Sequence, residues 1–264
     1  MKMNKRPSPK IVAVIPARYD SQRFPGKPLV SISGKSLIRR TYENALLCKG
    51  LDKALVATDD RRIMDHVEEF GGEAIMTSPK CPTGTDRLVE VLHKSRFCND
   101  ADIIVNIQGD EPCLSQEAIS AIIDLLLKDD SSVMSTAVTP ISSKEEASLP
   151  SVVKCVFDKN YNALYFSRAL IPSGKTKEKL KASQHYRHIG IYAFRKDFLP
   201  IYGELSPTPL QLSEDLEQLK VLEHGYRIKV AVVKDDAIGV DTPEDISKVE
   251  SFLCSQNTFS SQGE

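Results

Sequence analysis

The sequence predicts an α/β fold with a mostly parallel sheet, because strand patterns and helix patterns alternate along the first part of the chain. Short apolar runs at residues 11–15, 54–58 and 74–77 are typical of strands that are buried on both faces of a sheet. Patterns typical of amphipathic helices separate these runs, at residues 37–47 and 61–70. This βαβαβ order indicates parallel strands that are joined by right-handed crossovers.

Length and composition limit the classes of protein to which the chain can belong. Its 264 residues can bury a large core, and we expect one domain at 11–253, a flexible leader at 1–10 and a disordered tail at 254–264. A net charge of -1 gives no general reason to expect a nucleic acid or an anionic membrane as a partner. The six cysteines have no C-x-x-C or zinc-ligand spacing. The first apolar run is too short for a signal peptide or a membrane span, so we expect a cytoplasmic protein.

The loop after the first strand gathers three positive charges. Pro16 cannot donate to a sheet ladder, and Gly26 allows backbone conformations that other residues avoid, so the chain leaves the sheet here. Arg18, Arg23 and Lys27 lie in this loop. Ligands of open α/β sheets bind at the carboxyl ends of strands, where three cations suit a polyphosphate. A solvated basic loop explains one such residue better than it explains three together.

Helix and turn signals follow the first two strands. Ser36 is a candidate N-cap for the first helix, and Asp59 and Asp60 are both interpreted as caps of the second. Lys35 completes a G-K-S sequence like the end of a P-loop, but Leu29 stands where that motif requires its first glycine. We therefore interpret Lys35 as a turn residue.

Two later loops carry residues for which a ligand and a helix cap are both reasonable interpretations. Thr83, Gly84 and Thr85 offer hydroxyls and an open backbone to a base or ribose, but Thr85 is equally suited to capping the next helix. Asp110 directly follows an apolar strand, where it could hold Mg²⁺ with substrate phosphates or cap the helix that begins near Gln116. The residue types alone leave both alternatives open at each loop.

The second half of the chain departs from the simple alternation. After a helix at 119–127 and a strand at 133–139, residues 142–209 are predicted to form an excursion that contains a hairpin of strands at 152–157 and 163–166. Its lysine-rich part is interpreted as a solvated loop rather than a nucleic-acid site, because no aromatic residues lie among the lysines. These lysines are Lys175, Lys177, Lys179 and Lys181.

One strand of this excursion alternates between polar and apolar faces. His188, Gly190 and Tyr192 share one face, and Ile189 and Ile191 share the other, because successive side chains of a strand point to opposite sides. The polar face can line a cavity.

The last third of the chain predicts a helix, a strand and a second helix. Four leucines at helical spacing place the first helix at 212–222, and a strand follows at 228–233. Thr242 is a candidate N-cap of the final helix, with Pro243 at its first position. Asp241 lies just before this cap and is free to bind a ligand.

Several motifs between residues 11 and 253 resemble those of the sugar cytidylyltransferases, and they occur in the order expected for that family. The motifs are I-P-A-R-Y-D-S-Q-R-F-P-G-K-P-L, T-G-T-D-R, Q-G-D-E-P, Y-F-S-R, R-H-I-G-I-Y, L-E-Q-L-K and G-V-D-T-P-E-D. The resemblance implies a Rossmann-like nucleotidyltransferase fold, in which the β-rich excursion binds a sugar and forms a homodimer interface. It also implies transfer of CMP from CTP to 3-deoxy-D-manno-octulosonate, with Mg²⁺ as cofactor, for lipopolysaccharide assembly.

The resemblance further implies a role for individual residues of this sequence. Nucleotide contacts are expected from Pro16, Ala17, Arg18, Arg23, Lys27, Thr83, Gly84 and Gln108. Sugar contacts are expected from Gln108, Arg168, His188, Tyr192, Glu217 and Gln218. Asp110 and Asp241 are the expected metal ligands and act in catalysis with Arg18 and Lys27, while Glu111 has a supporting role. His188 is a candidate general base, but metal activation of the attacking hydroxyl needs no separate base.

Three other functions fit parts of the same sequence. A cytidylyltransferase for another sugar acid would differ mainly in the sugar pocket, and a glycosyltransferase would release a nucleoside diphosphate instead of pyrophosphate. A regulator that binds CTP without turnover is disfavoured, because both Asp110 and Asp241 are present.

Overall fold

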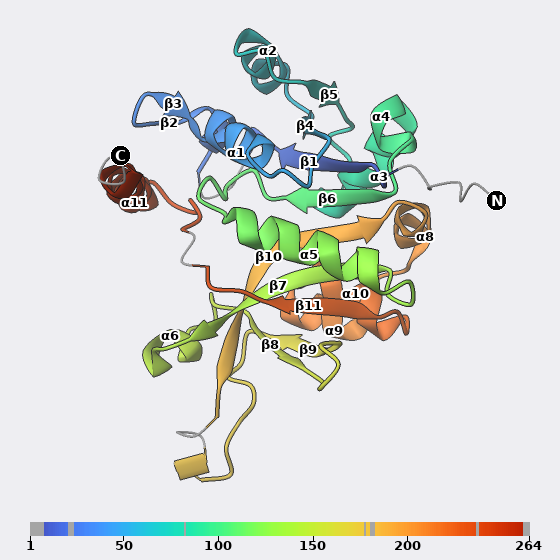
Figure 1. Cartoon of the computed structure of the whole chain (residues 1–264), viewed down its shortest axis with the longest axis vertical. Helices are drawn as coiled ribbons and strands as arrows, with labels where there is room; N and C mark the ends of the chain where they lie inside the picture. The colour runs from blue at the N-terminus through green and yellow to red at the C-terminus, as the bar shows by residue number, and fades with distance from the viewer. Residues whose placement is uncertain are drawn as a thin grey trace, which may run out of the picture.

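The computed structural model describes residues 8–20, 24–81, 83–176, 178–179, 183–235 and 238–260. Within these ranges, nine strands form one large sheet, whose main path runs in the order β11-β7-β10-β6-β1-β4-β5 (Figure 1). The strands of this path are β1 (Ile11–Ala17), β4 (Lys53–Thr58), β5 (Ala74–Met76), β6 (Ile103–Ile107), β7 (Met134–Ile141), β10 (His185–Arg195) and β11 (Ile228–Val232).

The predicted α/β fold is confirmed, and most neighbouring strands are parallel. β1 pairs in parallel with β4 and β6, β4 with β5, and β11 with β7. β10 is the exception, because it lies antiparallel between β6 and β7. Within the described ranges, no helix combines the length and the apolarity that a membrane span requires.

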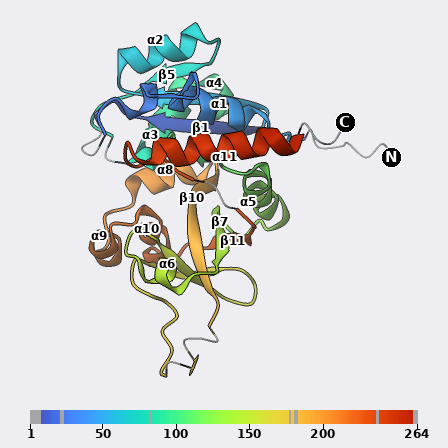
Figure 2. The same ribbon diagram turned by 90° about the vertical axis from the view of Figure 1, so that its left-hand side faces the viewer.

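Helices cover both faces of the sheet, which explains why strands such as β6 are buried along their whole length (Figures 1 and 2). One core contains residues of α1 (Leu37–Leu46), α2 (Arg61–Glu69) and α5 (Gln116–Lys128). The other contains residues of α3 (Gly84–Lys94), α4 (Arg96–Asn99), α8 (Phe198–Glu204) and α10 (Glu217–Glu223). The remaining short elements are η1 (Lys27–Leu29), β2 (Ser31–Ile32), β3 (Lys35–Ser36), α6 (Lys144–Ser148) and α9 (Pro209–Glu214).

The predicted excursion contains the expected hairpin, formed by β8 (Lys154–Phe157) and β9 (Ala163–Ser167). Figure 1 shows this hairpin on the opposite side of the molecule from α2. The excursion then returns to the middle of the main sheet as β10, so it is not a separate layer. Lys175 and Lys179 are exposed, as predicted, while Lys177 and Lys181 lie outside the described residues.

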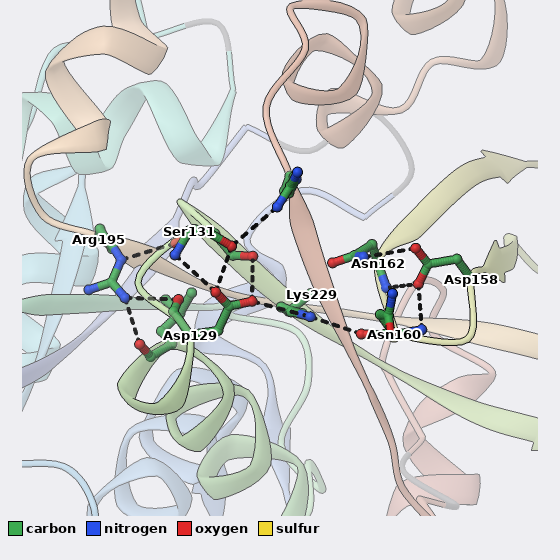
Figure 3. A network of polar contacts seen from close by, with 10 residues as sticks. Asp129, Ser131, Asp158, Asn160, Asn162, Arg195 and Lys229 are labelled. Carbon is green, nitrogen blue, oxygen red and sulfur yellow. Dashed lines mark hydrogen bonds and ion pairs between the residues drawn. The ribbon is translucent and has the colours of Figure 1, made fainter.

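A polar network ties the turn of this hairpin to the main sheet (Figure 3). The ammonium group of Lys229 on β11 lies 3.2 Å from a carboxylate oxygen of Asp129 and donates to the carbonyl of Asn160 at 2.8 Å. Asp158 closes the turn by accepting the backbone N–H groups of Asn160 and Asn162, both at 2.8 Å. The hairpin is therefore anchored to the end of α5 through the partly buried ammonium group of Lys229.

The helix predicted at 212–222 is in fact two helices. α9 ends at Glu214 and α10 begins at Glu217, because Asp215 adopts a left-handed conformation with φ of 52° that turns the chain. Leu212 belonged to the predicted apolar stripe, yet 68% of its surface is exposed. The leucine periodicity was therefore misleading across the turn.

Three residues were predicted to cap α1 and α2 with their side chains, and two of them, Ser36 and Asp60, are confirmed as N-caps. Their side chains accept the backbone N–H groups of Arg39 and Arg62. The interpretation of Asp59 as a cap is wrong, because Asp59 forms a 2.7 Å ion pair with the guanidinium of Arg87, which is fully buried. A buried charge requires a partner, and this requirement outweighs capping.

Predictions about two further segments need correction. The final helix, α11 (Asp245–Ser260), begins after Pro243, and the Asp245 carboxylate accepts the N–H of Thr242 at 3.0 Å in the turn before it. It also continues through residues 254–260, which were predicted to be a disordered tail. Figure 2 shows α11 crossing in front of β1. The interpretation of Lys35 as a turn residue is wrong, because Lys35 lies in the short strand β3, directly after the turn that contains Gly34.

Candidate active site

A cavity of about 310 Å³ lies at the carboxyl end of β1, where the sequence predicted a polyphosphate site. Pro16, Ala17 and Arg18 line it from the end of β1, and Lys27 lines it from the start of η1. Gln108, which follows β6, completes this side. Arg23, the third predicted cation, lies outside the described residues.

The loops after β1 and β6 approach each other closely at Gly109. A Cβ atom at this position would lie 2.7 Å from the carbonyl oxygen of Pro16, a distance that no side chain tolerates. The neighbouring strands are in parallel register, for example at Val14 and Asn106. A glycine is therefore required to bring Gln108 and Asp110 against the β1 loop.

The start of α3 adjoins the same cavity. Thr83, and not Thr85, is the N-cap, and it forms a capping box with Asp86. A Cβ atom at Gly84 would lie 3.4 Å from the ring of Pro16, so the helix start packs on the β1 loop. Arg18 reaches across to the same segment and donates to the carbonyl of Cys81. The predicted nucleotide residues of the two segments are thus neighbours.

Lys27 lies between the two carboxylates that were predicted to bind a metal. Its ammonium group is 2.7 Å from a carboxylate oxygen of Asp110 and 3.9 Å from one of Asp241, and it donates to the carbonyl of Val240 at 2.8 Å. Asp110 does not cap α5, because Ser115 does so. The ligand interpretation of Asp110 therefore keeps its support, while the alternative of a helix cap is excluded.

A second cavity, of about 580 Å³, shares Asp110 and Asp241 with the first. His188 and Gly190 of β10 line it, as the alternation of that strand predicted for a polar face. A Cβ atom at Gly190 would lie 3.8 Å from the side chain of Gln108, which places Gln108 beside both cavities. The two carboxylates therefore stand where the two cavities meet.

Glu111 and Arg187 also line the larger cavity, and Arg187 was missed by the sequence analysis. Strand alternation places Arg187 on the face opposite His188, so it gave no sign of a role at the cavity. A positively charged residue within a largely buried strand is the signal that could have identified it. Burial and the neighbouring charge of Asp110 raise the pKa of Glu111 from 4.5 to about 8, although Arg187 opposes this shift. The Glu111 side chain is therefore mostly protonated at pH 7, so part of the acidic wall of the larger cavity is uncharged.

His188 and Tyr192 form a buried aromatic group along β10. Their ring centroids are 5.5 Å apart, and the ring of Phe166 is 5.0 Å from that of His188. Burial lowers the pKa of His188 to about 3, so its ring is neutral at physiological pH, and one ring nitrogen hydrogen-bonds with the hydroxyl of Thr136. A neutral ring can orient a hydroxyl group but brings no charge to an anionic ligand.

The start of α10 contacts both the aromatic group of β10 and the start of α3, through Gln218 and Glu217. The Tyr192 hydroxyl donates to the side-chain oxygen of Gln218 at 3.1 Å, and the amide nitrogen of Gln218 has no partner among the described residues. Burial raises the pKa of Glu217, and hydrogen bonds from Thr85 and Thr83 oppose this shift. The start of α10 thus lies between the aromatic group and the start of α3.

Among the predicted sugar residues, His188 and Gln108 line the two cavities, whereas Arg168 lines neither cavity, and the same holds for Tyr192, Glu217 and Gln218. The guanidinium of Arg168 donates to the carbonyl oxygens of Glu214 at 2.8 Å, Pro150 at 3.3 Å and Asp215 at 3.3 Å. It is therefore held beside the cavity wall that begins at Ser151.

The residues at the junction of the cavities fit a magnesium ion better than a tightly enclosed metal. No group of three or more His, Cys, Asp or Glu side chains suited to a metal occurs in the described part of the chain. Mg²⁺ is commonly held by one or two carboxylates together with substrate phosphates and water, so a pair such as Asp110 and Asp241 is a sufficient protein donor set.

The cavities, their shared carboxylates and the basic β1 loop occur in a fold that has known relatives. A family model described as cytidylyltransferase matches residues 12–229. The chain belongs to the cytidylyltransferase family. Within that family, a 3-deoxy-manno-octulosonate cytidylyltransferase of Protochlamydia amoebophila is 58% identical over 250 residues, which cover 95% of this chain and 96% of the relative. One of Chlamydia caviae, with the same name, is 52% identical over 251 residues.

Solved structures agree with this membership. A CMP:2-keto-3-deoxy-manno-octonic acid synthetase complexed with CTP superposes with a TM-score of 0.87 and 42% identity, covering 94% of this chain and 99% of the other. A 4-diphosphocytidyl-2C-methyl-D-erythritol synthase from Anaerococcus prevotii has a TM-score of 0.61 at 16% identity, so it supports the fold alone. The cytidylyltransferase fold expected from the sequence motifs is confirmed.

Proposed function

We propose that this chain transfers CMP from CTP to 3-deoxy-D-manno-octulosonate and releases pyrophosphate. The observation that carries the proposal is the meeting of a basic cavity and a larger polar cavity at Asp110 and Asp241. A nucleotide in the first cavity and a sugar acid in the second would react at this junction. The relatives at 52% and 58% identity bear the name of this activity, and they match about 95% of the chain.

The nucleotide side of the reaction depends on the β1 loop. We assign Pro16, Ala17, Thr83 and Gly84 to the nucleoside, because the β1 loop and the start of α3 are in contact. Arg18 and Lys27 neutralise the triphosphate and then the departing pyrophosphate, which is where charge develops in a phosphoryl transfer. Arg23 belongs to the same loop by its place in the sequence.

The attacking group is the anomeric hydroxyl of the sugar, in line with the α-phosphorus. Asp110 and Asp241 would hold Mg²⁺, whose chemistry is to neutralise phosphate charge and to lower the pKa of a bound hydroxyl. Lys27, which contacts both carboxylates, would neutralise phosphate charge beside them. Most of the catalysis comes from positioning and from charge neutralisation, without a covalent intermediate on the protein.

The acceptor side uses the polar wall of the larger cavity. We assign Gln108 and His188 to the sugar at this wall. Tyr192, Glu217 and Gln218 do not line the cavity, and we assign them to the sugar hydroxyls from the group that adjoins His188. Arg168 and Arg187 are the guanidinium groups beside this wall that can pair with the sugar carboxylate. His188, whose pKa is lowered by burial, would contact the sugar as a neutral ring.

The wider role follows from the product. Activated octulosonate serves lipopolysaccharide assembly, and we place the enzyme in the cytoplasm as a homodimer that associates through the excursion at 142–209. Light scattering tests the dimer: a mass near 29.3 kDa for the purified chain would contradict it, and twice this mass would support it.

The first experiment measures pyrophosphate release from CTP and Mg²⁺ with and without 3-deoxy-D-manno-octulosonate, beside a sialic acid control. Release only with the octulosonate supports the proposed reaction. Release with the sialic acid instead points to a different sugar-acid cytidylyltransferase. CTP binding without release with any acid would indicate a regulator.

A further inference from the structure

Two segments that carry predicted sugar contacts are joined through Glu214, a residue to which no role has been given so far. β9 leads into Arg168, and α10 begins at Glu217. Glu214 is the last residue of α9 and lies three positions before Glu217. Its side chain points to the β9 segment and not to α10.

The Glu214 carboxylate accepts three hydrogen bonds from one stretch of chain. The Ser167 hydroxyl donates at 2.6 Å, the backbone N–H of Arg168 at 2.8 Å and the Tyr165 hydroxyl at 3.3 Å. Desolvation raises the pKa of Glu214, but these hydrogen bonds outweigh it and leave the pKa below its usual value. The carboxylate is thus ionised and fully engaged, which makes the contact strong and directional.

Arg168 returns to the same turn with its side chain. Its Nε donates to the backbone carbonyl of Glu214 at 2.8 Å and one terminal nitrogen donates to that of Asp215 at 3.3 Å. Asp215 is the left-handed residue that separates α9 from α10. The contact between the two segments is therefore reciprocal, and it fixes the turn from which α10 starts.

A buried lysine extends this unit to the wall of the larger cavity. Lys154 has no exposed surface, and its ammonium group donates to the carbonyl oxygens of Arg168 at 2.6 Å, Val152 at 2.7 Å and Leu149 at 3.0 Å. Val152 itself lines the cavity. A displacement of the Arg168 segment would therefore be transmitted to the cavity wall as well as to α10.

We propose that Glu214 is a positioning residue for the sugar acid: it locks the β9 segment to the turn before α10 and so sets the acceptor side of the site. This inference rests on the proposed function. Glu214 lines neither cavity, so it acts only through Arg168, α10 and the wall. Glu214 is not among the residues that line the nucleotide cavity on the β1 loop, so we expect it to affect CTP binding less than binding of the sugar acid.

The test compares Glu214→Ala with a matched control, Glu223→Ala. Glu223 is also a carboxylate of the α9 and α10 pair, and it accepts the backbone N–H groups of Leu210 and Gln211 at 3.1 Å, whereas its only interaction with β9 among the described residues is a charge effect on Tyr165. Glu223→Ala loses hydrogen bonds between α10 and α9, and Glu214→Ala loses those between α9 and the β9 segment. Only Glu214→Ala leaves the backbone N–H of Arg168 without its carboxylate acceptor. The readouts are KM for the octulosonate, KM for CTP, the Kd for CTP alone and Tm.

We expect Glu214→Ala to raise KM for the octulosonate by about tenfold or more and to change KM and Kd for CTP less than about twofold. Glu214→Gln keeps one accepting oxygen and should lie between wild type and Glu214→Ala. Glu223→Ala should lower Tm and leave both KM values near wild type. If Glu214→Ala does not fold, Glu214→Gln against Glu223→Gln gives the same comparison.

Other results would overturn the inference. An unchanged KM for the octulosonate in both Glu214 variants, or an equal rise of both KM values, would show that Glu214 has only a general structural role. An equal rise in the Glu223 control would show the same. If the wild type itself releases no pyrophosphate with the octulosonate, the proposed function fails first, so the two failures are distinguishable.

Discussion

The ammonium group of Lys27 has a decisive position among the individual residues, because it bridges the two carboxylates at the junction of the cavities. Only 13% of its side chain is exposed, against 34% for Asp110 and 60% for Asp241. A cation held in a partly dehydrated site acts more strongly on a nearby phosphate than one in water. The proposed reaction uses this same ammonium group to stabilise the leaving pyrophosphate.

We expect Lys27→Ala to lower kcat by roughly a hundredfold or more, because a charge contact to the transition state is lost. Lys35→Ala is the matched control, since Lys35 is an exposed lysine nearby in sequence whose partner is Glu43. Steady-state kinetics at saturating CTP measure the effect. A kcat near wild type for Lys27→Ala would remove Lys27 from the catalytic assignment.

Asp110→Asn tests the metal assignment at the same junction. We expect the Mg²⁺ concentration for half-maximal activity to rise at least about tenfold, because a carboxylate ligand is replaced by a neutral one. Asp65→Asn, on the exposed side of α2, is the control, since Asp65 pairs only with Arg61. An unchanged metal titration in Asp110→Asn, with an unchanged Tm, would exclude Asp110 from the metal site.

Among the elements, the contact between the loops after β1 and β6 matters most for the site. Gly109 permits this contact, and Thr41 of α1 donates to its carbonyl at 3.1 Å. The loop after β6 carries both Gln108 and Asp110. The separation of these two loops would therefore alter the nucleotide side and the metal carboxylate together.

Gly109→Ala tests this element contact. We expect KM for CTP to rise by about tenfold or more and Tm to fall, because the new Cβ would lie 2.7 Å from the Pro16 carbonyl and the loops would have to separate. Gly50→Ala is the control, since its Cβ would meet no atom closer than 3.8 Å. Similar results for the two variants would show that the close approach has no effect on nucleotide binding.

On the scale of the whole molecule, β10 divides the main path of the sheet into two parts. β1, β4, β5 and β6 lie on one side of it, and β7 and β11 lie on the other. Asp110 follows β6, and Asp241 follows β11, which lies beyond β10 and β7. Ligand sites in open sheets form where the strand order changes direction, and this junction is such a place.

The stability of the whole fold at low pH is predicted to depend in part on the carboxylate of Glu90. Desolvation of the Glu90 carboxylate is outweighed by hydrogen bonds from Lys94, the Ser78 backbone and Cys81, which lower its pKa from 4.5 to about 2. A lowered carboxyl pKa contributes stability that is present above about pH 4.5 and is lost as the pH falls toward 2. This contribution helps to hold the segment before Thr83 against α3.

We therefore expect Glu90→Gln to lower the free energy of unfolding by on the order of 2 kcal/mol at pH 7. The difference from wild type should shrink between pH 4.5 and pH 2. Urea unfolding across this pH range measures it, with the exposed Glu204 as control in Glu204→Gln. A difference that is constant with pH would mean that ionisation of Glu90 does not stabilise the fold.

Much of the site could be predicted because its chemistry lies in short segments. Lys27 and Asp110 were identified from a basic loop and an acid at strand ends, and both line the cavities. Arg187, the pairing of Asp59 with Arg87 and the position of Glu214 could not be predicted in this way. Each depends on residues that are distant in sequence and on burial, for which the periodicity of one segment gives no measure.

The sequence by itself determined the strands, most helices and the family, because periodicity, caps and motifs act over a few residues. Tertiary structure alone decided which loops meet. Lys27 donates to the carbonyl of Val240, which is 213 positions away, and β10 enters the sheet between β6 and β7. Such contacts depend on the packing of the complete sheet, since only the assembled strands bring their carboxyl ends to one edge.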